Sequence, residues 1–246
     1  MTEKNLRSFF DGLPGMHGLA EAALSGWHGA VWPLARGAML TVGDFLICGG
    51  DPGTEGRRML AKAMASQPRT WLIYAPEQWK ATLKVTALFH PAERQGFAVL
   101  TPDAPEREWE NLVRLPKGYT VRRMERWDAE ECLTEEWSRD FVREHGTVEK
   151  FLDRGIGVLA RDPSGRPAAG ASAYVSWPGG IEVQLQTRQD LQGQGLATAV
   201  AAELICQARK RHLAVAWDAA NDASAHIACK LGFVPGKCYT AWERIC

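Results

Sequence analysis

The sequence has no excess of charge of either sign. Among its 246 residues, 29 are lysine or arginine and 29 are aspartate or glutamate, so the formal net charge is zero. A neutral chain has no overall field that would attract nucleic acid or an anionic membrane. Hydrophobic residues make up 46% of the chain and charged residues 24%, as in an ordinary globular protein. We therefore expect no nucleic-acid partner.

Long apolar runs are also lacking. No apolar stretch of about 7 to 15 residues follows Met1, so the sequence predicts no secretory signal. The most apolar segment, 196–208, contains Glu203 and is shorter than the roughly 20 residues that a transmembrane helix needs. We expect a cytoplasmic protein with no membrane partner.

The six cysteines are scattered, and no C-x-x-C motif brings two of them together. Closely spaced ligand pairs are typical of zinc sites, and dense cysteines are typical of disulfide frameworks. His226 and Cys229 are three residues apart, but no second ligand pair accompanies them. We predict reduced thiols and no metal site.

The character of the chain changes near residue 115. Before that point the residues around Gly43-Asp44 predict a β-hairpin, and 70–74 and 97–100 predict further strands. Three prolines then interrupt a charged stretch between residues 101 and 118. We therefore predict two domains, a smaller α/β domain over 1–115 and a second domain over 116–246.

Polar and apolar residues alternate strictly over 181–186. In a strand such alternation places the two kinds of side chain on opposite faces. The polar face either lines a wet or catalytic site or simply faces solvent, and both interpretations stay open. The apolar face holds Ile181, Val183 and Leu185, and the polar face holds Glu182, Gln184 and Gln186.

A glycine-bearing turn, Gln192-Gly193-Gln194-Gly195, follows this strand and leads into a helix with an apolar stripe. Unpaired N–H groups at a helix start form an anion site for a phosphate or pyrophosphate. A Walker A loop would need a lysine here, and a dinucleotide fingerprint would need a third glycine where Thr198 stands. A nucleotide-binding protein of another fold remains an alternative.

These residues resemble the GNAT superfamily of acyl-CoA-dependent N-acetyltransferases. Gln192-x-x-Gly195-x-Ala197 is similar to its [QR]-x-x-G-x-[GA] signature, and Asn221 followed by 230–233 is similar to a second one. The resemblance covers about 118–246. A looser resemblance, based in part on 151–157, is to the branch that includes zwittermicin A resistance acetyltransferases.

The resemblance implies an α/β (α+β) fold. Its mixed, mostly antiparallel sheet would have splayed central strands, and the 1–115 domain would be a substrate cap or a degenerate acetyltransferase-like half. It implies acetyl-CoA as cosubstrate, with the pyrophosphate on the turn amides and the pantetheine arm along the strand. The implied CoA-binding residues are Leu185, Gln186, Thr187, Gln192, Gly193, Gln194, Gly195, Leu196, Ala197, Thr198 and Asn221.

The resemblance also implies direct transfer of an acetyl group to a primary amine of a small molecule. Glu182 is the candidate base, with a plain surface carboxylate as the alternative interpretation. The tyrosine that many family members use as acid is Ala228 here, so Tyr239 is the candidate acid, or else a packing residue. A non-catalytic CoA-binding or sensor protein is the alternative function. We expect the acceptor to bind between the two domains, and the protein to be a monomer or homodimer.

Overall fold

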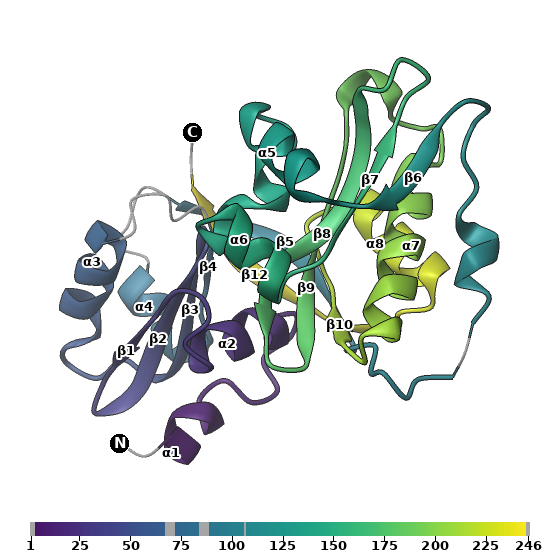
Figure 1. The fold of residues 1–246 in the computed structure, drawn as a ribbon. Coiled ribbons are helices and arrows are strands. Elements are labelled where there is room, and N and C mark those ends of the chain that lie inside the picture. The colour runs from purple at the N-terminus through teal and green to yellow at the C-terminus, as the bar shows by residue number, and fades with distance from the viewer. Residues whose placement is uncertain (1–2, 67–71, 84–88, 106, 245–246) are drawn as a thin grey trace.

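The computed structural model describes residues 3–66, 72–83, 89–105 and 107–244, and it shows two sheets with helices packed around them (Figure 1). Both sheets are mostly antiparallel, so the expected mixed α/β fold is confirmed. Within the described ranges, no helix is long and apolar enough to cross a membrane. The helices are α1 (Glu3–Ser8), α2 (His17–Leu24), α3 (Gly56–Ser66), α4 (Lys80–Leu83), α5 (Arg126–Thr134), α6 (Val148–Arg154), α7 (Leu196–Lys210) and α8 (Asp222–Leu231).

The larger sheet has seven strands in the order β1-β2-β3-β4-β12-β5-β11. These strands are β1 (Ala30–Pro33), β2 (Arg36–Val42), β3 (Phe45–Asp51), β4 (Leu72–Tyr74), β5 (Phe89–Phe97), β11 (Asp218–Ala219) and β12 (Pro235–Arg244). The smaller sheet has five strands in the order β10-β9-β8-β7-β6. They are β6 (Thr120–Arg123), β7 (Gly157–Arg161), β8 (Pro167–Trp177), β9 (Gly180–Thr187) and β10 (Ala214–Ala216).

The hairpin predicted around Gly43-Asp44 is present as β2 and β3, which pair from Arg36↔Asp51 to Val42↔Phe45. Gly43 has φ +57°, the positive value that a two-residue hairpin turn requires. A side chain at this position would also overlap the Tyr174 hydroxyl, which approaches from β8. The turn is therefore fixed both by local backbone chemistry and by a contact from the other sheet.

Two strand predictions in the first half need correction or restriction. Residues 97–100 do not form a strand: β5 ends at Phe97, and Leu100 makes only an isolated bridge with Val215. The sequence pattern does not predict β5, because most of its residues before Gly96 are polar and exposed or half-buried, and its pairing with β12 and β11 makes it a strand. Of the predicted strand 70–74, only β4 is described, and residues 70 and 71 lie outside the described residues.

Strands from both halves of the chain build the larger sheet. β12 pairs with β5 from Pro235↔Phe97 to Arg244↔Phe89 and also with β4, and β11 pairs with β5. The last strand of the sequence thus lies between two strands of the first 100 residues (Figure 1). A division of the chain at residue 115 into two folding units stays a prediction.

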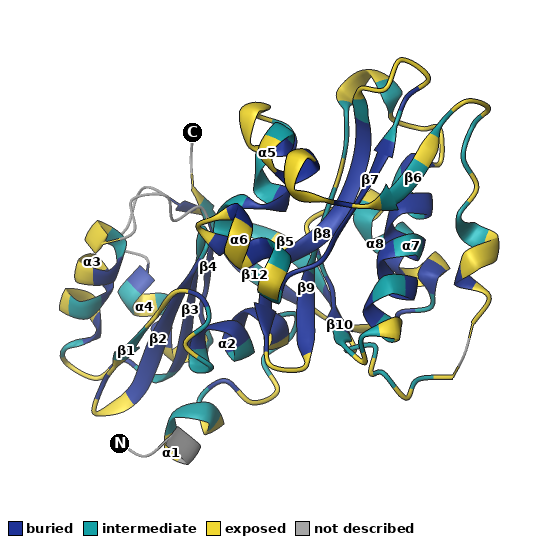
Figure 2. Cartoon of the chain, viewed as in Figure 1, coloured by how far each residue is buried: buried dark blue, intermediate teal, exposed yellow. Residues whose placement is uncertain are grey.

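The smaller sheet packs against α7 through small side chains. β8 is buried along nearly its whole length (Figure 2), and its alanines face an alanine-rich stripe of the helix. Small residues let helix and strand backbones approach closely and fill the core without voids. The buried alanines of this contact include Ala169, Ala171, Ala173, Ala199, Ala201 and Ala202.

Candidate functional site

Two neighbouring strands of the smaller sheet separate at Glu182. β10 runs parallel to β9 and pairs with it only from Ala214↔Gly180 to Ala216↔Glu182. The chain then leaves the smaller sheet and enters β11, which pairs with β5 of the larger sheet. The part of β9 after Glu182 therefore has an open edge, and Glu182 lies at the vertex of the opening.

The open edge presents backbone N–H groups. Successive residues of a strand direct their N–H and C=O groups to opposite edges. The carbonyl oxygen of Gly179 accepts from the amide of Ala214, 2.8 Å away on the β10 side, and the amide of Arg188 donates to Ala168 O, 2.9 Å away on the β8 side. By this alternation the N–H groups of Leu185 and Thr187 point into the opening.

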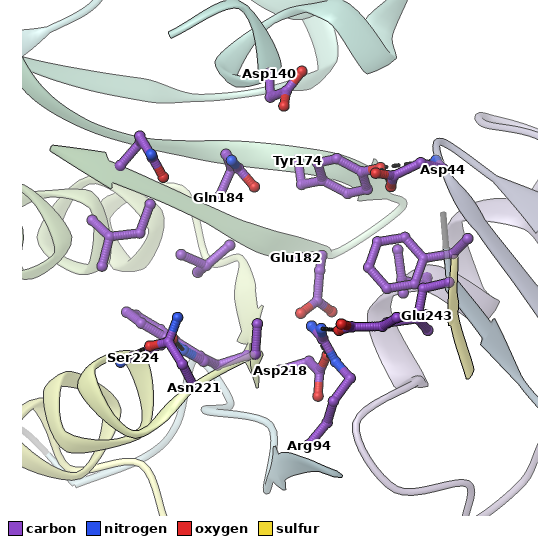
Figure 3. A pocket seen from close by; sticks show the side chains of 18 residues that line it. Asp44, Arg94, Asp140, Tyr174, Glu182, Gln184, Asp218, Asn221, Ser224 and Glu243 are labelled. Atoms are coloured by element: carbon purple, nitrogen blue, oxygen red, sulfur yellow. Dashed lines mark hydrogen bonds and ion pairs between the residues drawn. The ribbon is translucent and has the colours of Figure 1, made fainter. Parts of the chain in front are cut away.

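A cavity of about 350 Å³ occupies this opening, within the range of small-molecule sites (Figure 3). Both sheets contribute to its wall, and so do residues before and after position 115. The residues that line it are Leu19, Asp44, Phe45, Leu72, Arg94, Asp140, Tyr174, Glu182, Val183, Gln184, Leu185, Gln186, Trp217, Asp218, Ala220, Asn221, Ser224 and Glu243.

Glu182 is the most deeply placed acid of the cavity. Its exposure is 4%, and its Oε2 atom has no hydrogen-bond partner among the described residues. Burial raises the pKa of this carboxyl well above its ordinary value, and the nearby Asp218 carboxyl raises it further, while Arg94 opposes the shift. A carboxyl group of this kind is able to accept a proton near neutral pH.

Asp218 holds the centre of a buried polar cluster next to Glu182. Its Oδ2 accepts from Arg94 Nε at 2.8 Å, and its Oδ1 accepts from the Tyr239 hydroxyl at 2.7 Å. Arg94 Nη1 also lies 3.6 Å from Glu243 Oε1. Burial raises the pKa of Asp218 although Arg94 and Tyr239 favour its ionised form. Arg94 therefore forms its closest ion pair with Asp218 and a longer one with Glu243.

A second polar pair lies on the other side of Glu182 (Figure 3). The Tyr174 hydroxyl donates to Asp44 Oδ1 and accepts from the Asp44 backbone N–H at 3.1 Å. Asp140, from the 3-10 turn Arg139–Phe141, points toward the cavity from above and pairs with Arg143 at 2.8 Å. The β2–β3 turn thus brings an acidic group into a site built mainly by the second half of the chain.

The glycine turn lies beyond the far end of β9. Gly193 and Gly195 have φ of +78° and +81°, and a methyl group on either would meet no atom within 4 Å. The first hydrogen bond of α7 runs from Ala199 N to Gly195 O, so the amides of 196–198 have no acceptor within the helix. Residues 192–195 are exposed. The turn is thus open for close approach of an anion.

The predicted site residues fall into two groups. Glu182, Leu185, Gln186 and Asn221 line the cavity. Asn221 also caps α8, because its Oδ1 accepts from Ser224 N at 2.9 Å. The others do not line it, and these are Thr187, Gln192, Gly193, Gln194, Gly195, Leu196, Ala197, Thr198 and Tyr239. The roles of all these residues stay predictions.

Sequence pattern alone does not reveal most of the other cavity residues. Asp218 directly follows the apolar run 213–217, which has the pattern of a short buried strand, and a position at a strand end is the one signal that the sequence offers. Arg94 lies in a strand that sequence pattern did not reveal. Asp44 was visible only as a turn residue, and Asp140 only as one charge among many. Over the ranges that the structure describes, no cluster of three or more histidine, cysteine or acidic side chains could hold a metal ion.

Comparison with known proteins shows which proteins this chain resembles. A search of curated proteins gave no match. A GCN5-related N-acetyltransferase-like protein from Streptococcus suis 89/1591 is 29% identical, with a TM-score of 0.87 over 99% of this chain and 98% of that one. A GCN5-related N-acetyltransferase from Kribbella flavida is 18% identical, with a TM-score of 0.61 over 92% of both chains. The fold is also similar to that of a tandem GNAT protein from the clavulanic acid biosynthesis pathway, at 14% identity and a TM-score of 0.51 over 84% of this chain and 78% of that one.

The family model described as GNAT acetyltransferase matches residues 18–242, which is most of the sequence and includes strands of both sheets. The chain belongs to the GNAT acetyltransferase family.

Proposed function

We propose that this protein transfers an acetyl group from acetyl-CoA to a primary amine of a small molecule. The observation that carries the proposal is the vertex at Glu182. There a buried carboxyl group with an unpartnered oxygen lies where β9 and β10 separate, at the start of a strand edge with open N–H groups. Family membership supports acetyl transfer. The looser sequence resemblance to zwittermicin A resistance acetyltransferases favours a small-molecule amine.

The residues present fit acetyl-CoA. Two glycines at which a methyl group would meet no atom within 4 Å, and the amides at the start of α7, suit the pyrophosphate. The edge of β9 at Leu185, Gln186 and Thr187 suits the amide groups of the pantetheine arm, and Asn221 borders the same opening. When bound, acetyl-CoA supplies a thioester as the acetyl donor.

Glu182 has the surroundings of a general base. An alkyl ammonium must lose a proton before its nitrogen can bond to the acetyl carbon as the carbon–sulfur bond breaks. The raised pKa of Glu182 suits it to take that proton, directly or through water. An N–H on the open edge of β9, such as that of Leu185, would stabilise the oxyanion that forms.

The thiolate that leaves must also gain a proton, and its source is a separate proposal. Ala228 is buried in α8 and carries no acidic hydrogen on its side chain. Tyr239 is our candidate acid, although its hydroxyl donates to Asp218 and it does not line the cavity. Proton transfer from Tyr239 would therefore pass through the Asp218 cluster or through water.

The experiment is acetyl transfer to a broad panel of amines, followed by thiol release and by the mass of the product. We expect Glu182→Gln to lower kcat by about a hundredfold or more, because general-base catalysis contributes that much. Glu203→Gln in α7 is the matched control and is expected to keep wild-type rates, because Glu203 is only half-buried, pairs with Gln207 and does not line the cavity. Absence of CoA release with every amine would overturn the proposal.

One observation favours a second function, binding of acyl-CoA without catalysis. The usual acid position is occupied by Ala228, and the Tyr239 hydroxyl is held by Asp218. A sensor of this kind would bind CoA in calorimetry, would show no transfer, and would bind equally well as Glu182→Gln.

A further inference from the structure

More carboxyl groups line the cavity than the binding of one acetyl-accepting amine requires. Five carboxyl groups line it, from Asp44, Asp140, Glu182, Asp218 and Glu243, against a single guanidinium group, from Arg94. Arg94 does not balance them, because two of its nitrogens lie 2.8 and 2.6 Å from Asp218 Oδ2. The space that remains is lined by carboxyl groups on more than one side.

The Glu182 side chain is placed where it could meet a positively charged group of a ligand. The carboxyl group is 4% exposed, and its Oε2 atom lies against Gly18 without a hydrogen-bond partner among the described residues. Ionising a carboxyl group at this depth costs free energy unless a cation lies beside it. The side chain points into the cavity from the vertex of the strands (Figure 3). A cationic group that enters the cavity would lie next to this carboxyl group.

Two further acids, Asp44 and Asp140, line the cavity at a distance from the Asp218 cluster. Asp44 is half-buried, and its Oδ1 accepts a hydrogen bond from the neutral Tyr174 hydroxyl. Asp140 is more open, with 38% of its side chain exposed, and it shares its charge with Arg143. Both lie on the side of the cavity away from Asp218 (Figure 3).

The wall near these acids is apolar. Leu19 from α2, Phe45 from β3 and Leu72 from β4 line the same cavity. Phe45 packs edge-on against Tyr174, with ring centroids 5.8 Å apart. A wall of this kind suits methylene groups better than hydroxyl groups, because burying a hydroxyl group without a partner costs free energy.

From this arrangement we propose that the acceptor is an aliphatic molecule with at least two amino groups. One amine lies at Glu182 for acetylation, the carbon chain lies along Phe45 and Leu72, and a second ammonium group is held by Asp44 and Asp140. The proposal rests on the proposed acetyl transfer and adds the class of acceptor. A monoamine would leave the outer acids without a cation.

The experiment compares diaminoalkanes of three to six carbons with monoamines of the same length, using acetyl-CoA and the full chain. We expect kcat/KM to be at least about tenfold higher for the best diamine, since one hydrogen bond to a charged group contributes about that factor. Calorimetry with the same amines, in the absence of acetyl-CoA, is expected to show tighter binding of the diamine.

The variant Asp44→Asn removes the negative charge at this position and keeps nearly the same side-chain shape. The variant keeps an Oδ1 acceptor for Tyr174 and removes the negative charge. We expect it to reduce the diamine preference, as the ratio of the two kcat/KM values, by about tenfold. Asp51→Asn is the matched control, because Asp51 lies at the other end of the same hairpin, pairs with Arg36 and does not line the cavity.

The outcomes distinguish the two proposals. Equal rates and equal binding for diamines and monoamines, or an unchanged preference in Asp44→Asn, would overturn the diamine acceptor while acetyl transfer stands. No transfer to any amine would overturn acetyl transfer itself, and the diamine acceptor with it.

Discussion

Gly18 of α2 lies against Glu182 so closely that a methyl group at position 18 would overlap the Oε2 atom of the carboxyl group. The same methyl group would lie 2.9 Å from Trp177 Cζ3 and 3.1 Å from Ala216 Cβ. A helix near the start of the chain therefore forms the floor beneath the candidate base. Glu182 is buried because this helix lacks a side chain at one position.

Gly18→Ala tests this contact. Helix propensity alone would make the change stabilising by about 1 kcal/mol. We expect the opposite, a loss of about 1–3 kcal/mol in the free energy of unfolding, because the added methyl group forces Glu182 and Trp177 to move. Acetyl transfer is expected to fall with it. Denaturant unfolding and kcat measure the two effects, and a more stable variant with full activity would contradict the packing.

The pKa of Glu182 predicts two pH effects. As a base, Glu182 must be ionised, so kcat/KM is expected to rise with pH through an inflection well above the ordinary glutamate value of 4.5. In the folded protein this carboxyl keeps its proton at pH values where the unfolded chain has lost it, so its contribution to stability falls as pH rises through that window.

Glu182→Gln removes both effects. The stability of the variant relative to wild type is therefore expected to increase with pH, as followed by urea unfolding at a series of pH values. A wild-type profile with its inflection near 4.5, or a stability difference that does not change with pH, would show that Glu182 is an ordinary solvated carboxylate.

Two buried histidines, His28 and His145, predict loss of stability in acid. Their rings lie edge to face with centroids 4.8 Å apart. The Ser176 amide donates to His28 Nε2 at 3.2 Å, so His28 must be neutral to keep this bond. Burial lowers the pKa of His28, and it lowers the pKa of His145 from 6.5 to about 4.

Because the unfolded chain binds these protons first, stability is expected to fall as pH drops from about 6.5 to about 4. His145 alone accounts for roughly 3 kcal/mol of this loss. His145→Gln is expected to flatten the dependence of the unfolding free energy on pH, whereas His226→Gln, at an exposed position, is expected to leave it unchanged. Equal slopes for the two variants would contradict the prediction.

Replacing a glycine of the turn 192–195 is expected to lower CoA affinity, and a control glycine elsewhere separates this effect from backbone strain. Gly195 has φ +81° and Gly165 has φ +83°, and a methyl group on either would meet no atom within 4 Å. Replacement by alanine should strain both backbones similarly, by about 1 kcal/mol. Only Gly195→Ala is expected to weaken CoA binding in calorimetry, because only that turn begins α7. Equal CoA affinities would argue against a phosphate site there.

Tyr239→Phe tests the cluster around Asp218. The change leaves Asp218 Oδ1 without its 2.7 Å donor, and we expect a stability loss of about 1–3 kcal/mol. If Tyr239 also supplies the proton for the leaving thiolate, kcat falls too, by about a hundredfold. Tyr74→Phe is the control, since Tyr74 packs against Tyr239 with ring centroids 5.3 Å apart. A full kcat in Tyr239→Phe would exclude it as the acid.

Local sequence was sufficient for features that depend on neighbours along the chain. The alternation over 181–186 places Ile181, Val183 and Leu185 on the core side of β9, as predicted. The glycines at 193 and 195 do take positive φ values and do lead into a helix at Leu196. Hydrophobic period, turn chemistry and helix starts are short-range properties, so the sequence pattern reports them directly.

Tertiary structure decided what surrounds Glu182. Alternation along the strand predicts that Glu182 lies on a polar face. Its burial depends on Gly18, more than 160 positions earlier in the sequence. Arg94, Asp218 and Glu243 meet because β5, β11 and β12 pair in one sheet, and Asp44 joins them through contact of its hairpin with Tyr174. The sequence by itself therefore determined the two faces of β9, the glycine turn before α7 and the family resemblance. Only packing between distant segments decided the acidity, depth and enclosure of the site, because desolvation and charge proximity depend on distances in space rather than on spacing along the chain.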